Sequence, residues 1–332
     1  MKNDAKSSDC IRLRVSLCIL CLLMVCALLI APVLFQNLQT PYFTAEHPNY
    51  LLGSTTHPTD DDLGKTPTED SEHTSTEDTP LVVAPYPSYL EMCELDYVAP
   101  PLKRTRQEAL AHIATLAPSY PAMYIVLENQ ERYPDEMLKS LAGNPEMTDY
   151  MYGYLSSDGS VTGGITSEET PDSYPLFLQW DIRWGYYHYG KETLASSGCG
   201  PSCLAMAVYY LTGDTSVTPN AVADYSTAHN YYVKDVGTAW ALLDSYPTHF
   251  GLSVTHPSNN EVSLKTHLDA GNVLICSVRA GDFTAEGHFI VIYGYDENGF
   301  KINDPKCVYR SRLSWTYDQI KDDIKRIWSI AK

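Results

Sequence analysis

Apolar positions in the second half of the chain form helical runs first and strand-like runs afterwards. Helical spacing recurs in four segments, 199–211, 219–230, 237–250 and 259–270. Short apolar runs typical of strands occupy 175–179, 272–278, 288–293 and 299–303. A turn-forming stretch joins the last two of these runs, which favours an antiparallel sheet. The order of the segments predicts an α+β domain, a helical half followed by an antiparallel sheet, over residues 174–332.

A long uncharged stretch lies near the N-terminus, at residues 15–35. At about 1.5 Å per residue it spans roughly 30 Å, the thickness of the hydrocarbon layer of a bilayer. Basic residues precede it and an acidic segment follows. The positive-inside rule therefore predicts a cytoplasmic tail at 1–14, a transmembrane signal anchor at 15–35, and the rest of the chain outside the cell membrane. A cleaved signal peptide, which would release a secreted protein, and a lipid-modified Cys26 are the alternatives.

Two further segments separate this stretch from the α+β domain. Residues 36–87 are rich in Thr, Ser, Pro, Asp and Glu, and they hold too few large apolar groups to offset the entropy of ordering. They predict a disordered acidic stalk, with an acidic interaction tail as the alternative. Residues 88–155 carry short helical patterns interrupted by prolines, which predicts an all-helical arm. We expect this arm to support the next domain structurally; a regulatory pro-segment is the alternative.

Composition narrows the possible partners and cofactors. The 332 residues include 41 acidic and 23 basic ones, a formal net charge of −18, and a polyanion favours a basic patch, so nucleic acid is not expected as a partner. The nine cysteines are not spaced as a disulfide framework or a zinc ribbon. Because the sequence holds neither a His-Glu-x-x-His motif nor a glycine-rich phosphate loop, no metal and no cofactor are expected. Cys203 and Cys276 are expected to be buried free thiols, with a disulfide between them as the alternative; the pairing of Cys93 and Cys307 stays open.

Cys199 is the candidate nucleophile. It opens the helical run 199–211 within Gly198-Cys199-Gly200-Pro201. A thiol reacts as its thiolate, and the unpaired N–H groups of a helix N-terminus favour that anion. The two glycines permit close approach of a substrate, and proline is suited to a first helical turn. A buried cysteine without a catalytic role is the alternative.

His288 and Asp304 are the candidates for the base and for the group that orients it. His288 begins an apolar run and could form an ion pair with a thiolate. Asp304 lies in Asn303-Asp304-Pro305, and the midpoint between 288 and 304 falls inside the turn-forming stretch 294–299. A hairpin folded about that midpoint would place the two residues directly opposite each other on one face, but a loop one residue different would break the pairing.

Acyl transfer also needs hydrogen-bond donors for the developing oxyanion. Gln179, at the end of the apolar run before Cys199, could supply a side-chain N–H beside the backbone N–H of Cys199. Aromatic residues between 180 and 189 either line a cleft or pack in the core.

Four motifs stand in this order along the chain: 175–184 (PLFLQWDIRW), 197–201 (SGCGP), 287–291 (GHFIV) and 303–305 (NDP). Together they resemble the C39-like papain-fold cysteine peptidase family, over roughly residues 174 to 330. The resemblance implies a papain-like α+β fold and a bacterial protein that is membrane-anchored or secreted. It also implies four site roles: Cys199 as nucleophile, His288 as base, Asp304 as orienting group and Gln179 as oxyanion donor.

These observations predict a cysteine peptidase that cleaves amide bonds through a Cys199 thioester outside the membrane. Its expected substrate is a peptide or protein, and both a cell-wall peptide and a secreted protein are compatible with the sequence. A catalytically silent surface binding module is one alternative. An acyl or amide transferase is another, because an amine can capture the same thioester.

Overall fold

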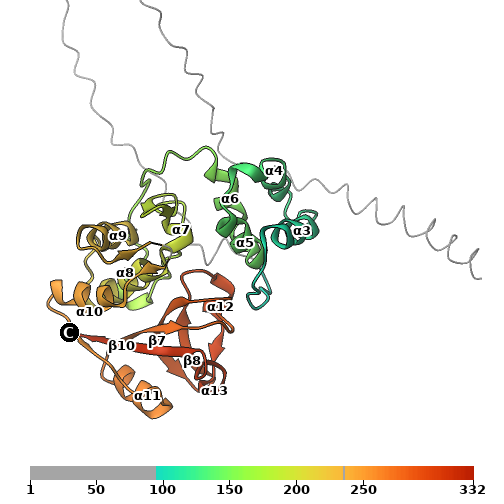
Figure 1. Ribbon diagram of the computed structural model, residues 1–332. Coiled ribbons are helices and arrows are strands. Elements are labelled where there is room, and N and C mark those ends of the chain that lie inside the picture. Colours follow the sequence, from blue (N-terminus) through green and yellow to red (C-terminus); the bar gives the residue numbers. More distant parts are fainter. Residues whose placement is uncertain (1–94, 235) are drawn as a thin grey trace, which may run out of the picture. The chain divides into compact units, whose positions relative to one another are not determined.

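The computed structural model describes residues 95–234 and 236–332 (Figure 1). The tail, transmembrane helix and stalk predicted at 1–14, 15–35 and 36–87 lie outside the described residues, as do Cys93 and the start of the arm. Within the described ranges, none of the helices combines the length and the apolar character needed to cross a bilayer.

The described part of the arm, from residue 95 on, contains four short α-helices and two 3₁₀ turns. Their bounds are α3 Arg106–Leu116, α4 Ala122–Glu128, η1 Gln130–Arg132, α5 Asp135–Gly143, η2 Pro145–Met147 and α6 Thr148–Tyr154. Prolines and polar caps set where they begin: Thr105 and Glu108 form a capping box on α3, and Pro134 precedes α5. The helices bury apolar residues such as Ile113 and Leu138 in a core shared with the following domain. The helical content agrees with the pattern of the sequence, and the domain boundaries stay predictions.

The helical half of the α+β domain surrounds one long buried helix. The helices are α7 Leu194–Ser197, α8 Cys199–Thr212, α9 Pro219–Ala228 and α10 Trp240–His249. Every residue of α8 from Gly200 to Leu211 is buried. The helix ends at Gly213, whose φ of 73° lies in the left-handed region that favours glycine. Two short hairpins accompany these helices: β1 His188–Tyr189 with β2 Glu192–Thr193, and β3 Tyr232–Val233 with β4 Gly237–Thr238.

The second half is an antiparallel sheet of six strands in the order β5-β10-β6-β7-β8-β9. Their bounds are β5 Ser253–Thr255, β6 Val273–Val278, β7 His288–Asp296, β8 Gly299–Asn303, β9 Ser314–Trp315 and β10 Ile324–Ala331. Alternating side chains of β6 and β7 enter two different apolar clusters, so both faces of the sheet are covered. Helix α8 contacts β6 and β7, and α11 (Glu261–Asp269) contacts the same two strands (Figure 1). The α+β class with an antiparallel sheet is confirmed.

Two elements differ from the sequence-based expectation. The strand predicted at 175–179 is wrong, because these residues form irregular buried backbone. The Gln179 N–H donates to the Pro305 carbonyl at 2.8 Å and joins no strand of the sheet. The apolar run reflects burial and not strand pairing. In contrast, β10 is a central strand that the pattern does not predict.

Buried ion pairs join Glu169, in the segment before the α+β domain, to Arg183 and Asp181 near the start of that domain. Arg183 is 3% exposed; its Nε donates to Asp181 Oδ2 at 2.9 Å and its Nη1 donates to Glu169 Oε2 at 2.7 Å. Replacing Arg183 with leucine leaves these two carboxylates close together without their cation. We expect a loss of about 3–5 kcal/mol in the free energy of unfolding, measured by chemical denaturation at pH 7. A loss below about 1 kcal/mol, the scale of an exposed pair, would contradict this view of the network.

Candidate active site

Helix α8 places Cys199 at its first residue, with Gly198 as the cap. Gly200 is needed here, because a Cβ on it would lie within 2.8 Å of three side-chain atoms of Thr238 on the β3–β4 hairpin. Pro201 lies in the first helical turn, where its missing N–H costs no hydrogen bond. Cys199 is partly exposed, whereas the other three described cysteines, Cys203, Cys276 and Cys307, are buried; all four are free thiols.

The surroundings of Cys199 favour its thiolate. Burial alone raises the pKa of the Cys199 thiol, but the hydrogen bond and charge of the His288 imidazole lower it, with smaller contributions from Lys306 and the Phe289 backbone. The net pKa lies below the ordinary value. By contrast, burial raises the pKa of the Cys203 thiol, one helical turn later, well above its ordinary value. Only the first of these two thiols is therefore prepared to act as a nucleophile.

His288 and Asp304 form a buried pair. His288 Nε2 lies 2.7 Å from Asp304 Oδ1, and the two residues are 3% and 0% exposed. Because Nε2 faces Asp304, Nδ1 is left for the hydrogen bond with Cys199. Burial lowers the pKa of His288, but the charge and hydrogen bond of Asp304 and the contact with Cys199 raise it, and the net pKa is raised. A raised imidazole pKa beside a lowered thiol pKa favours a thiolate–imidazolium pair.

Asp304 is held from three directions. Its Oδ1 accepts from His288 and from the Lys306 backbone N–H at 2.8 Å, and its Oδ2 accepts from Arg310 Nε at 2.7 Å. Burial raises the pKa of Asp304, but the charges of Arg310 and His288 lower it to about 2. The carboxylate is therefore ionised and oriented at every pH near neutrality. Sequence reasoning missed Arg310, because Lys306, Arg310 and Arg312 all follow Asp304 closely and the sequence does not choose among them.

The β7–β8 hairpin has a different centre from the one that the sequence predicts. Asp296 pairs with Gly299, so the loop is two residues long and is centred beyond residue 296. Tyr293 is an extra residue of β7 and forms a β-bulge. The prediction that His288 and Asp304 lie directly opposite each other is therefore wrong.

The two side chains nevertheless share one face of the hairpin. The pairing of Val291 with Asn303 is the last one before β8 ends, and continuing it by one residue sets Asp304 beside Ile290. Since side chains alternate along a strand, Ile290 and His288 lie on the same face. If the bulged residue were paired regularly, the register would shift by one and Asp304 would fall on the other face.

Gln179 lies between the two halves of the site. It is fully buried; its Nε2 donates to the Ala195 carbonyl at 2.5 Å, and its backbone N–H donates to Pro305. Ala195 is four residues before Cys199, and Pro305 directly follows Asp304. The Gln179 amide thus engages α7. Its Oε1 has no hydrogen-bond partner among the described residues.

The aromatic residues after Gln179 mostly belong to the core. Trp184 and Tyr189 are fully buried, and Trp180 is 3% exposed with its Nε1 donating to the Lys306 carbonyl at 2.8 Å. Trp180 therefore fixes the backbone beside Asp304. Within residues 95–234 and 236–332, no group of three or more His, Cys, Asp or Glu side chains is arranged to hold a metal ion.

Comparison with known proteins points to one family. Residues 172–332 match the sequence model of the Peptidase_C39 like family. The peptidase domain of Streptococcus ComA, described as a bi-functional ABC transporter involved in a quorum sensing pathway, is 18% identical, with 41% of this chain and 91% of that chain covered and a TM-score of 0.32. A Bacillus anthracis protein described as a C39-like peptidase is 14% identical, with 41% and 89% covered and a TM-score of 0.31. A comparison with curated proteins finds no match.

Proposed function

Residues 172–332 belong to the Peptidase_C39 like family, and we propose that they hydrolyse amide bonds of a peptide or protein with Cys199 as nucleophile. One observation carries the proposal. A thiol with a lowered pKa, at the start of a buried helix, is hydrogen-bonded to His288, whose far nitrogen lies 2.7 Å from a buried, ionised Asp304. Nucleophile, base and orienting group thus stand in the relation that covalent acyl transfer requires. A helical half followed by an antiparallel sheet supports a papain-like arrangement.

The proposed reaction begins from the Cys199 thiolate and the His288 imidazolium. The Cys199 thiolate attacks the substrate carbonyl carbon, and the proton on His288 Nδ1 passes to the leaving amine as the C–N bond breaks. The product is a thioester on Cys199 and a neutral His288. Water then attacks the thioester while His288 takes its proton, which releases the acid and restores the thiolate–imidazolium pair. We assign the stabilisation of the oxyanion to the Cys199 backbone N–H and, from the family resemblance of the 175–184 motif, to the side-chain amide of Gln179.

Alkylation of Cys199 tests the thiolate directly. We expect iodoacetamide to modify Cys199 with a pH midpoint below 9.0, the ordinary value for a thiol, because His288 stabilises the anion. The modification is assigned to Cys199 by mass spectrometry of the digested protein, with Cys203 of the same protein as the internal control. A midpoint at or above 9.0 would contradict the proposed ion pair.

Product analysis separates hydrolysis from its alternatives. A peptide mixture incubated with the full-length protein is expected to yield new carboxyl and amino termini, and alkylation of Cys199 should stop their formation. Products that carry an added amine in place of a free carboxylate would indicate a transferase. A reactive Cys199 without any turned-over peptide would indicate a binding module.

The location of the protein is also a proposal. The uncharged run at 15–35 and the basic residues before it support a single-pass anchor in the cell membrane with the peptidase domain outside. This proposal rests on the sequence alone.

A further inference from the structure

The arm reaches residues four and five positions after Asp304. The carboxylate of Glu146, in the 3₁₀ turn η2, accepts two backbone hydrogen bonds, from Val308 N–H at Oε2 and from Tyr309 N–H at Oε1, both at 2.8 Å. Glu146 is itself held by Asn144, whose Oδ1 accepts from the Glu146 N–H at 3.1 Å. The hydrogen bond from Val308 to Glu146 joins two residues that are 162 positions apart in the sequence.

The two N–H groups open the short helix α12 (Val308–Arg312). The first N–H groups of any helix lack partners within it, and the cap residue Cys307 offers no side-chain hydrogen bond. Glu146 therefore supplies from the arm the acceptors that the local sequence lacks. A charged acceptor makes a stronger hydrogen bond than a neutral one, so this contact fixes the position of α12.

Helix α12 carries the cation that holds the catalytic carboxylate. Arg310 Nε donates to Asp304 Oδ2 at 2.7 Å, and both side chains are buried. Asn144 also fixes the connecting backbone, because its Nδ2 donates to the Lys306 carbonyl at 2.6 Å while the Lys306 N–H donates to Asp304 Oδ1. One continuous set of hydrogen bonds therefore runs from the arm to the carboxylate that orients the imidazole.

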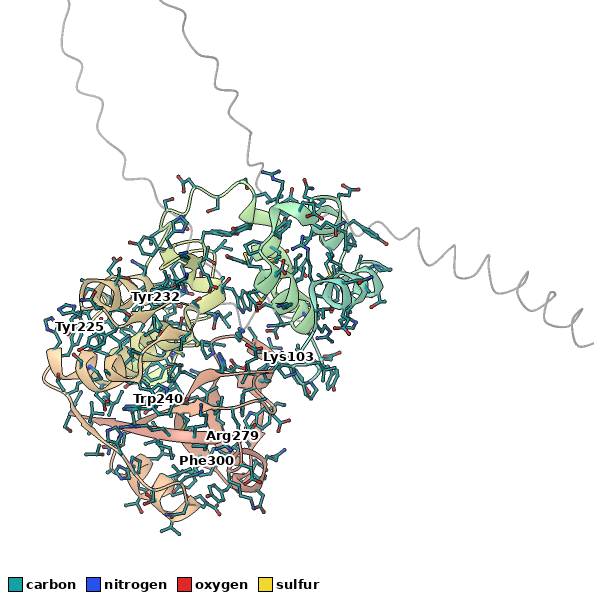
Figure 2. All side chains as sticks on the ribbon, in the orientation of Figure 1. Lys103, Tyr225, Tyr232, Trp240, Arg279 and Phe300 are labelled. Atoms are coloured by element: carbon teal, nitrogen blue, oxygen red, sulfur yellow. The ribbon has the colours of Figure 1, made fainter. Side chains whose placement is uncertain are left out.

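A second contact joins the arm to the segment before His288. Lys103 Nζ lies 3.0 Å from Glu286 Oε1, and Lys103 lies where the arm meets the sheet domain (Figure 2). Both side chains are more than two-thirds exposed, at 80% and 67%. An exposed pair of this kind contributes little to holding a structure in place. Of these two contacts, the one made by Glu146 and Asn144 can therefore hold the backbone after Asp304 in place.

We propose that Glu146 is a positioning residue of the active site: it fixes α12, and α12 keeps Arg310 on Asp304 and Asp304 on His288. This inference rests on the proposed function of Cys199 and His288. It makes the arm part of the catalytic apparatus, although Glu146 acts only through α12 and Asp304. Loss of Glu146 loosens Arg310, weakens the hold of Asp304 on His288, and so reduces the stabilisation of the Cys199 thiolate.

The test uses the full-length protein with Glu146→Ala and Glu146→Gln, and Glu136→Gln as the matched control. Glu136 is an exposed carboxylate of the same arm, paired with Lys139 on its own helix. Alkylation of Cys199 is followed against pH, and kcat and KM are measured on a peptide that the protein cleaves. We expect Glu146→Ala to raise the pH midpoint of alkylation and to lower kcat about 10- to 100-fold with KM within about 2-fold, because orientation is lost and binding is not.

Glu146→Gln keeps the shape and one acceptor oxygen, so it is expected to fall between the wild type and Glu146→Ala. If Glu146→Ala does not fold by circular dichroism, Glu146→Gln decides the question. A low alkylation midpoint in the wild type that is unchanged in the Glu146 variants, with kcat equal to that of Glu136→Gln, would overturn this inference and leave the proposed function standing. An ordinary midpoint in the wild type would overturn both.

Discussion

Replacing Cys199 with alanine is expected to abolish peptide hydrolysis and leave the fold intact. Without the sulfur no thioester forms, and loss of a catalytic nucleophile typically lowers kcat by about 10⁴-fold or more. Cys199 is only partly buried and lies at the end of α8, so its loss leaves no closed cavity. We expect the melting temperature to stay within about 4 °C, the shift that about 1 kcal/mol produces in a domain of this size. Activity assays and thermal unfolding of the purified variant measure the two effects.

Cys276→Ala is the matched control. Cys276 is a fully buried thiol of β6 in the second apolar cluster and is not one of the proposed site residues. Its removal should cost stability, on the order of 1–2 kcal/mol, and leave turnover within about 2-fold. If Cys199→Ala retained hydrolysis, or if both variants lost it equally, Cys199 would not be the nucleophile.

Replacing Asp304 with alanine is expected to reduce activity and stability together. The variant loses the group that orients His288, and loss of the orienting carboxylate in a catalytic triad costs about 10⁴-fold in kcat. It also leaves Arg310 as a buried cation without its carboxylate, which costs about 3–5 kcal/mol of unfolding free energy. His288→Ala should reduce kcat more than Asp304→Ala, because the base itself is removed. Equal losses of activity in the two variants would contradict the orienting role of Asp304.

The acid sensitivity of folding gives an independent measure of Asp304. Its pKa of about 2 in the folded protein is below the ordinary 3.8, so its ionised form stabilises the fold above about pH 4. This contribution, on the order of 2 kcal/mol, is lost as the pH falls from about 4 through 2. The raised pKa of His288 has the opposite effect. Its contribution to the free energy of unfolding is present below pH 6.5 and is lost as the pH rises through the pKa of the folded protein. Asp304→Asn should flatten the acid limb of the stability curve, and an unchanged limb would contradict the assignment.

Elements with a strong local signal were predictable from the sequence. Helix α8 and the strands β6 and β8 lie within a residue or two of their expected bounds, because a long apolar run or a run bounded by turn residues needs no distant partner to be recognised. The segment 175–179 shows where this reasoning ends. Its apolar residues are buried by tertiary contacts, and its backbone bonds to a loop more than 100 residues away.

The proposed catalytic residues were predictable from the sequence, but the residues that hold them in position were not. Cys199 and His288 stand in local sequence contexts that indicate their proposed roles, whereas Asp304 was indicated by its spacing from His288 and by the family resemblance. Glu146 does not: it is one of many carboxylates in an acidic chain, and its contact with Val308 depends wholly on how the arm packs. Arg310 became recognisable only when the fold brought it to Asp304.

The bulge at Tyr293 bears on how related sequences should be aligned. In a regular hairpin with this two-residue loop, the numbers of paired residues add to an odd sum, as 296 and 299 do. Residues 288 and 304 add to an even sum, so regular pairing would place their side chains on opposite faces. The unpaired Tyr293 shifts the register by one residue and brings the two side chains to the same face. Deleting that residue would leave a regular ladder with the histidine and the aspartate still on one side. A gap of a single position between these two motifs is therefore compatible with an intact histidine–aspartate pair, and a spacing one residue shorter does not by itself argue against that pair.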